Sequence, residues 1–135
     1  MESIHSYPII GELSAEAQNS IQPFLTINKY AANDIVLQQG QVGADFHIIV
    51  SGTLDVFVEK KTQERISKAQ VATLTAGQFF GEMSCLAGHV VSATVQARKA
   101  VKTVSLSKEG MLQLMDESAP FRKFMVTEMI HRIAS

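Results

Sequence analysis

The sequence predicts a mainly β domain, a sandwich or barrel of about eight short strands flanked by helices. Two observations support this. Between Leu25 and Leu106 apolar residues recur with a period of two, and turn residues interrupt them at intervals of about ten. Both ends of the chain instead show helical spacing. With 46% hydrophobic and 19% charged residues, the 135-residue chain can bury a core as one domain spanning 1–135.

A first helix is predicted at about 14–24. Ser14 can cap its N-terminus, and Glu16 in the first turn suits the positive end of the helix dipole. Ala17, Ile21 and Phe24 follow at helical spacing.

The predicted β region covers about 25–106. In its fourth strand Leu54, Val56 and Val58 alternate with other residues, which gives the strand one fully apolar face. Glu59–Lys68 is predicted as a polar hairpin loop. The predicted strands are Leu25–Tyr30, Ile35–Gln38, Phe46–Ser51, Thr53–Glu59, Gln70–Leu74, Ser92–Ala97 and Val101–Leu106.

Two helices are predicted over about 107–134. Ser107 is a suitable N-cap, and Pro120 interrupts the first helix and begins the second. The second helix carries a wide apolar stripe, which favours contact with the core. A homodimer seam or a lid over a ligand is the alternative. The stripe is Phe121, Phe124, Met125, Met129, Ile130 and Ile133.

One segment carries the candidate site. The run Phe80-Gly81-Glu82-Met83-Ser84-Cys85-Leu86 is followed, after a loop, by Ser92-Ala93-Thr94-Val95. A glycine-started turn of this kind aims backbone N–H groups at a small anion. Glu82 only accepts hydrogen bonds when ionised, so it suits hydroxyl donors such as those of a ribose.

This segment resembles the phosphate-binding cassette of the cyclic nucleotide-binding domain family, which includes protein kinase A regulatory subunits and the catabolite activator protein. In that family a Phe-Gly-Glu-apolar-small-apolar-apolar run precedes a loop and then Arg-small-Ala-Thr-Val. The resemblance extends over about 7–133 and implies an eight-stranded β jelly roll, a double-stranded β-helix. It also implies a cyclic nucleotide, cAMP or cGMP, as the ligand.

The resemblance implies a ligand site at nine positions. Gly81 would allow a close backbone approach, and Glu82 would bind the ribose hydroxyl. Amides near Ser84 and Cys85 would hold the phosphate, with Ser92 and Ala93 opposite. The full set is Gly81, Glu82, Met83, Ser84, Cys85, Val91, Ser92, Ala93 and Thr94.

The chain departs from the family at Val91, which stands where the phosphate-binding arginine is expected. Valine supplies neither charge nor hydrogen-bond donor, so we expect weakened cyclic nucleotide binding. His89 on the same loop is a substitute cation only when protonated. Arg98 lies seven residues further along an extended strand, at the opposite end.

A purely structural interpretation stays open for the same residues. Gly77 and Gly81 can be turn glycines only, and Glu82 can bond helix-start amides. Cys85 is typical of a small buried hydrophobe, and a catalytic pair with His89 lacks a third orienting group. The sequence therefore predicts no enzyme and no catalytic residue.

Composition excludes several classes of protein. A net charge of −1 without clustered Lys and Arg argues against nucleic-acid binding. No apolar stretch approaches the roughly 20 residues that cross a bilayer, and the N-terminus lacks a secretion signal, so we expect no membrane insertion and a cytoplasmic location. Cys85 is the only cysteine and the histidines show no metal spacing, which predicts no metal site and no cofactor besides a weak nucleotide ligand.

The sequence thus predicts a non-enzymatic regulatory sensor module in signal transduction, with weakened or altered cyclic nucleotide binding. The alternative is a ligand-free jelly-roll scaffold that serves dimerisation or protein interaction within a larger regulatory assembly.

Overall fold

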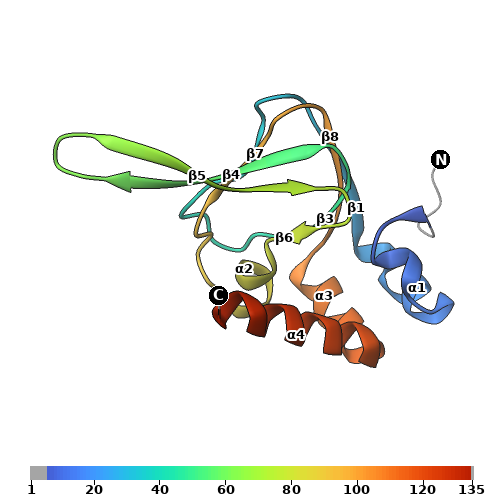
Figure 1. The fold of residues 1–135 in the computed structure, drawn as a ribbon. Coiled ribbons are helices and arrows are strands. Elements are labelled where there is room, and N and C mark those ends of the chain that lie inside the picture. Colours follow the sequence, from blue (N-terminus) through green and yellow to red (C-terminus); the bar gives the residue numbers. More distant parts are fainter. Residues whose placement is uncertain (1–5, 135) are drawn as a thin grey trace.

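The chain folds into two antiparallel four-stranded sheets with helices before, between and after the strands (Figure 1). The computed structural model describes residues 6–134, so residues 1–5 and 135 of the predicted domain lie outside the described residues. The strands are β1 (Leu25–Tyr30), β2 (Ile35–Leu37), β3 (Phe46–Ser51), β4 (Thr53–Lys61), β5 (Ile66–Thr75), β6 (Phe79–Phe80), β7 (Thr94–Ala97) and β8 (Val101–Leu106). The helical elements are η2 (Ile10–Glu12), α1 (Ala15–Ile21), η3 (Gln22–Phe24), α2 (Glu82–Ala87), α3 (Lys108–Glu117) and α4 (Ala119–Ala134). The predicted jelly roll with flanking helices is confirmed.

The helix starts follow local hydrogen bonds. The Ser14 side chain accepts from the Ala17 amide at 3.1 Å, and Ser107 accepts from the Gly110 amide at 3.2 Å, as predicted for the two caps. Helix α4 begins at Ala119, one residue before Pro120, because the Ser118 hydroxyl accepts from the Phe121 amide at 3.2 Å.

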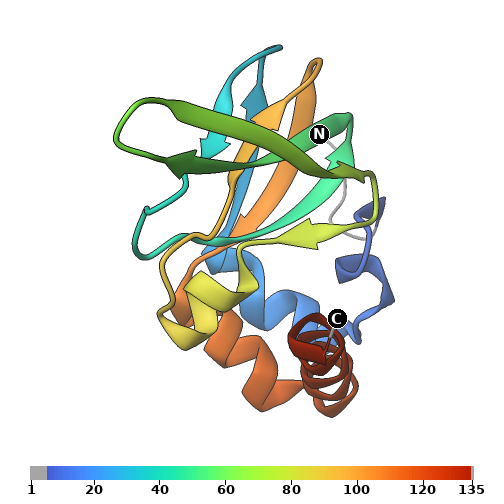
Figure 2. The ribbon, with the colours of Figure 1, turned by 60° about the vertical axis from the view of Figure 1, so that its left-hand side comes forward.

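Two cores lie on the two faces of one sheet. The sheet with order β1-β8-β3-β6 turns Phe46, Ile48 and Val104 toward the helices, where Ile21 and Met125 are fully buried. Helices α1, α3 and α4 therefore gather on one side of the β region (Figure 2).

The second core lies between the sheets. The other face of the same sheet turns Ile49, Phe80 and Val101 toward the sheet with order β2-β7-β4-β5. Leu54 and Val95 meet them there. The alternation of inward and outward residues in the sequence accounts for this pairing of faces.

Strands β4 and β5 form a long hairpin whose tip projects away from the body (Figure 1). The predicted loop Glu59–Lys68 is wrong in extent, because pairing continues to Lys61↔Ile66. The turn is closed by hydrogen bonds from the Thr62 amide and hydroxyl to the Arg65 carbonyl. Exposed polar strands lack apolar alternation, which is why the sequence pattern indicated a loop.

The candidate segment connects β6 to β7. Strand β6 pairs with β3 through His47↔Phe80, and α2 follows directly. Strand β7 begins at Thr94, so Ser92 and Ala93 lie in the loop before it rather than in the predicted strand.

Candidate functional site

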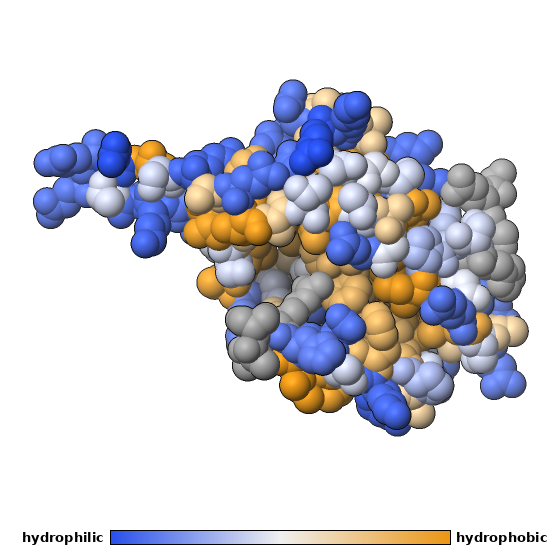
Figure 3. Space-filling view, in the orientation of Figure 1, coloured by the Kyte–Doolittle hydropathy of each residue, from blue (hydrophilic) through white to orange (hydrophobic). Residues whose placement is uncertain are grey.

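A cavity of about 310 Å³ opens at the root of the hairpin, within the size range of small-molecule sites. Its walls come from β2, β4, β5, β6 and β7, from the start of α2 and from the loop before β7. Figure 3 shows apolar side chains gathered around a hollow beneath the hairpin. The lining residues are Leu37, Val56, Ala72, Leu74, Phe79, Phe80, Gly81, Glu82, Met83, Ser84, Val90, Val91, Ser92, Ala93 and Val95.

Gly81 sets the entry into α2. It has a left-handed backbone with φ of 87°, and a Cβ at this position would collide with the Asp45 carbonyl oxygen. Only glycine fits both the φ value and this contact. The first amides of α2 begin at the cavity wall because Gly81 makes this turn.

Glu82 and Ser84 place oxygen atoms in a mainly apolar wall. Glu82 is 2% exposed and is the one ionisable side chain among the lining residues. The Ser84 hydroxyl accepts a hydrogen bond from the Ala44 amide at 3.1 Å. Ser84 therefore also ties α2 to the loop before β3.

Val91 is held in the wall by its backbone. Its amide donates to the Gln41 carbonyl at 2.8 Å, and its carbonyl accepts from the Gly40 amide at 2.7 Å. Its side chain is 8% exposed and packs in the core between the sheets. Position 91 is thus fixed beside the cavity, and its side chain contributes apolar surface.

Residues 27–118 match the family model described as the cyclic nucleotide-binding domain. The chain belongs to the cyclic nucleotide-binding domain family. The match covers most of the chain, including the whole of the cavity wall.

Curated relatives agree with this assignment. The chain is 30% identical over 112 residues to a cAMP-dependent protein kinase regulatory subunit of Schizosaccharomyces pombe, covering 83% of this chain and 26% of the relative. It is 29% identical over 112 residues to the subunit of the same name from Blastocladiella emersonii, covering 83% and 27%. The chain therefore spans about a quarter of the length of these relatives.

Solved structures show the same fold. The Thermus thermophilus catabolite activator protein superposes with a TM-score of 0.74 at 22% identity, covering 98% of this chain and 58% of that one. The regulatory domain of Toxoplasma gondii PKA with cAMP superposes with a TM-score of 0.73 at 19% identity, covering 93% and 47%.

In this cyclic nucleotide-binding domain, most of the nine predicted site residues lie together in the cavity wall. They are Gly81, Glu82, Met83, Ser84, Val91, Ser92 and Ala93. Cys85 and Thr94 lie outside that lining. The Thr94 hydroxyl accepts from the Gln39 amide at 3.1 Å, so it supports the loop after β2.

Cys85 belongs to the core beneath the helices. Its side chain is 2% exposed, and its amide donates to the Gly81 carbonyl at 2.9 Å within α2. Burial raises the pKa of the Cys85 thiol to about 11, with a further contribution from the charge of Asp45. A thiol in this state is a poor nucleophile, as the hydrophobe interpretation expects.

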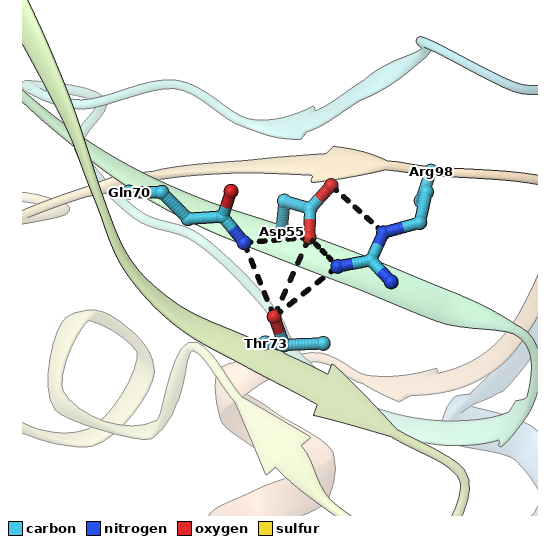
Figure 4. A network of polar contacts seen from close by, with 4 residues as sticks. All are labelled: Asp55, Gln70, Thr73 and Arg98. Carbon is cyan, nitrogen blue, oxygen red and sulfur yellow. Dashed lines mark hydrogen bonds and ion pairs between the residues drawn. The ribbon is translucent and has the colours of Figure 1, made fainter.

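The cations considered from the sequence lie elsewhere. His89 is exposed and is not part of the cavity wall. Arg98 forms an ion pair with Asp55 at 2.6 Å, and both contact Thr73 on β5 (Figure 4). The hydrogen bond from Arg98 lowers the pKa of the Asp55 carboxyl.

Sequence reasoning missed the apolar side of the cavity. Val56, Ala72 and Leu74 belong to the β4–β5 hairpin and line the cavity beside Leu37 of β2 and Val95 of β7 in the same sheet, where Val56 pairs with Val95. The inward alternation in β4 was a usable signal for Val56. The register of β5 had no such signal in the sequence.

Among residues 6–134, no group of three or more His, Cys, Asp or Glu side chains is arranged to hold a metal ion. None of the helices in that range is both long and apolar enough to cross a bilayer.

Proposed function

We propose that this domain is a non-enzymatic, cytoplasmic regulatory sensor whose cyclic nucleotide binding is weakened by valine at position 91. The main support for this proposal is the composition of the cavity wall. The cavity has the glycine turn and the buried Glu82 at one end, and no basic side chain in its wall. The ligand class is supported by the similar proteins whose names mention cAMP. The position of the ligand is supported by the residues that resemble the family's phosphate-binding cassette.

The missing cation has a calculable cost. A buried phosphodiester beside the first turn of α2 would be held by amides alone. Removing one partner of a buried charge pair costs about 2 to 5 kcal/mol, or roughly 30-fold to several-thousand-fold in affinity. The binding of cyclic AMP and of cyclic GMP should both be weakened, because the two ligands share the same cyclic phosphate.

The output route in this proposal runs through α4. Phe79 lines the cavity and meets Phe124 of α4 edge-on, with ring centroids 5.8 Å apart. A ligand that shifts Phe79 would therefore shift the helix. The position of α4 would be the signal read by a partner.

Titration calorimetry with cAMP and cGMP tests the proposal. The natural protein should bind each more weakly than micromolar, and Val91→Arg should tighten binding by at least about 2 kcal/mol, roughly 30-fold. Ile66→Arg at the hairpin tip, where the residue is 62% exposed, adds the same charge and should change nothing. Micromolar or tighter binding by the natural protein would contradict the proposal.

A second candidate function is a ligand-free dimerisation scaffold. It is favoured by apolar side chains left exposed on α4, with Val126 at 46% and Ile130 at 57%. If Val91→Arg gains no affinity while light scattering shows a homodimer that Ile130→Asp disrupts, this scaffold function is the better account.

A further inference from the structure

The charge balance of the cavity differs from what a cyclic nucleotide requires. Glu82 is the single ionisable side chain in the wall, so the formal charge carried by that wall is negative. The basic candidates on the loop before β7 and after β7, His89 and Arg98, are absent from the lining. Apart from the first amides of α2, an anionic ligand would therefore meet no positive group in this wall.

A third candidate cation is His47, whose ring stacks on Phe80 with centroids 4.9 Å apart and an interplanar angle of 2°. Phe80 lines the cavity, so His47 lies directly behind the wall. Burial lowers the pKa of His47 to about 4, so the ring is neutral at pH 7. It offers the cavity no counter-charge.

The rest of the cavity suits the uncharged part of a nucleotide. Val56, Leu74 and Val95 present apolar surfaces from β4, β5 and β7, which favour a flat ring. Glu82 is positioned at the start of α2, where the family resemblance expects the sugar. A carboxylate oxygen accepts a hydrogen bond from a ribose hydroxyl.

A 3′,5′-cyclic nucleotide has one free ribose hydroxyl, because the other two oxygens carry the phosphate. A nucleoside keeps the 2′- and 3′-hydroxyls and has no negative charge. The absence of charge favours the nucleoside in this cavity, because the nucleoside avoids burying an anion without a cation.

We infer that the cavity selects an uncharged nucleoside over the corresponding cyclic nucleotide. This inference rests on the proposed function, since it assigns the ligand class of the same site. Apart from Glu82, the lining offers no charged or amide side chain beside the apolar walls, so discrimination among purine bases should be weak.

Titration calorimetry with adenosine, guanosine, cAMP and cGMP on the full chain tests the inference. Each nucleoside should bind the natural protein at least tenfold more tightly than its cyclic nucleotide. Val91→Arg should reverse that order, and Ile66→Arg should preserve it.

Glu82→Gln provides a second, independent readout. Losing the carboxylate should weaken the binding of adenosine about tenfold, because a neutral amide oxygen is a poorer acceptor for a ribose hydroxyl. The same change should raise the affinity for cAMP relative to the affinity for adenosine, because it removes a negative charge from the wall.

Two results would overturn the inference. One is a cyclic nucleotide that binds the natural protein as tightly as its nucleoside, in which case the proposed regulatory site survives with its usual ligand. The other is no nucleoside binding at millimolar concentration. Here Val91→Arg separates the cases: if it binds cAMP, only the nucleoside preference is lost, and if it binds nothing, the proposed function is lost too.

Discussion

At the scale of single residues, the site depends on one backbone conformation. Gly81 lets the chain turn from β6 into α2 while lying against the Asp45 carbonyl. That turn places Glu82 in the cavity wall and the hydroxyl of Ser84 on the Ala44 amide. The chemistry at the wall therefore follows from the absence of a side chain at position 81.

Gly81→Ala should destabilise the domain by about 3 kcal/mol, from a left-handed alanine and a displaced backbone contact. Gly77→Ala is the matched control, because Gly77 has φ of 90° but a Cβ added there would have no atom within 4 Å. It should cost about 1 kcal/mol. Urea unfolding measures both, and equal losses would show that the Asp45 contact does not matter.

At the scale of elements, the β4–β5 hairpin carries one wall of the cavity while much of it is exposed. Its root is fastened by a polar network on its outer face, in which Asp55 of β4 accepts from Arg98 after β7 and from Gln70 of β5 (Figure 4). Further out, the Gln39 side chain pairs with both backbone groups of Glu59. These contacts fix the hairpin to the loop after β2 and to the turn after β7.

Arg98→Ala should speed amide hydrogen exchange in β5 while leaving β3 and β8 unchanged. The reason is that Arg98 joins Asp55 and Thr73, which lie on neighbouring strands, and that β5 is the edge strand of its sheet. Lys99→Ala, an adjacent exposed cation, is the control. Unchanged exchange in β5 would mean that the backbone ladder alone holds the hairpin.

Elements with a clear apolar period could be predicted from the sequence, and others could not. The caps at Ser14 and Ser107 were predictable because each depends on a local pattern. The outer half of the hairpin was not, because its strands are polar on both faces and pair without burying side chains. Phe79–Phe80 was missed as a strand because both residues are buried, which leaves no alternation.

The residues of the candidate site likewise fall into those that the sequence could predict and those that it could not. Gly81–Ser84 and Val91–Ala93 are contiguous in sequence, so a motif could place them in one wall. Ala72 and Leu74 reach the cavity only through the register of β5 on β4, which a bulge between Val56 and Phe57 shifts. Long-range register is set by the whole sheet and leaves little trace in a short window of sequence.

At the scale of the whole molecule, the space between the two sheets is mainly apolar but also holds a buried polar group. His47 of β3 is 6% exposed, and its Nδ1 lies 3.1 Å from the Thr103 hydroxyl of β8. Thr103 also accepts from the Asn28 side chain of β1 at 3.2 Å. A neutral histidine fits this arrangement, and a protonated one would have to leave water without a counter-ion.

This burial couples global stability to pH. The pKa of His47 falls from 6.5 to about 4 on folding, so between these values the unfolded chain binds the additional proton. The stabilisation is complete above pH 6.5 and is lost as pH falls toward 4. Urea unfolding at pH 7 and pH 5 should show a loss of about 2 kcal/mol. His47→Gln should abolish that loss, whereas His131→Gln, at an exposed position, should retain it. A pH dependence that persists in His47→Gln would assign the effect to other groups.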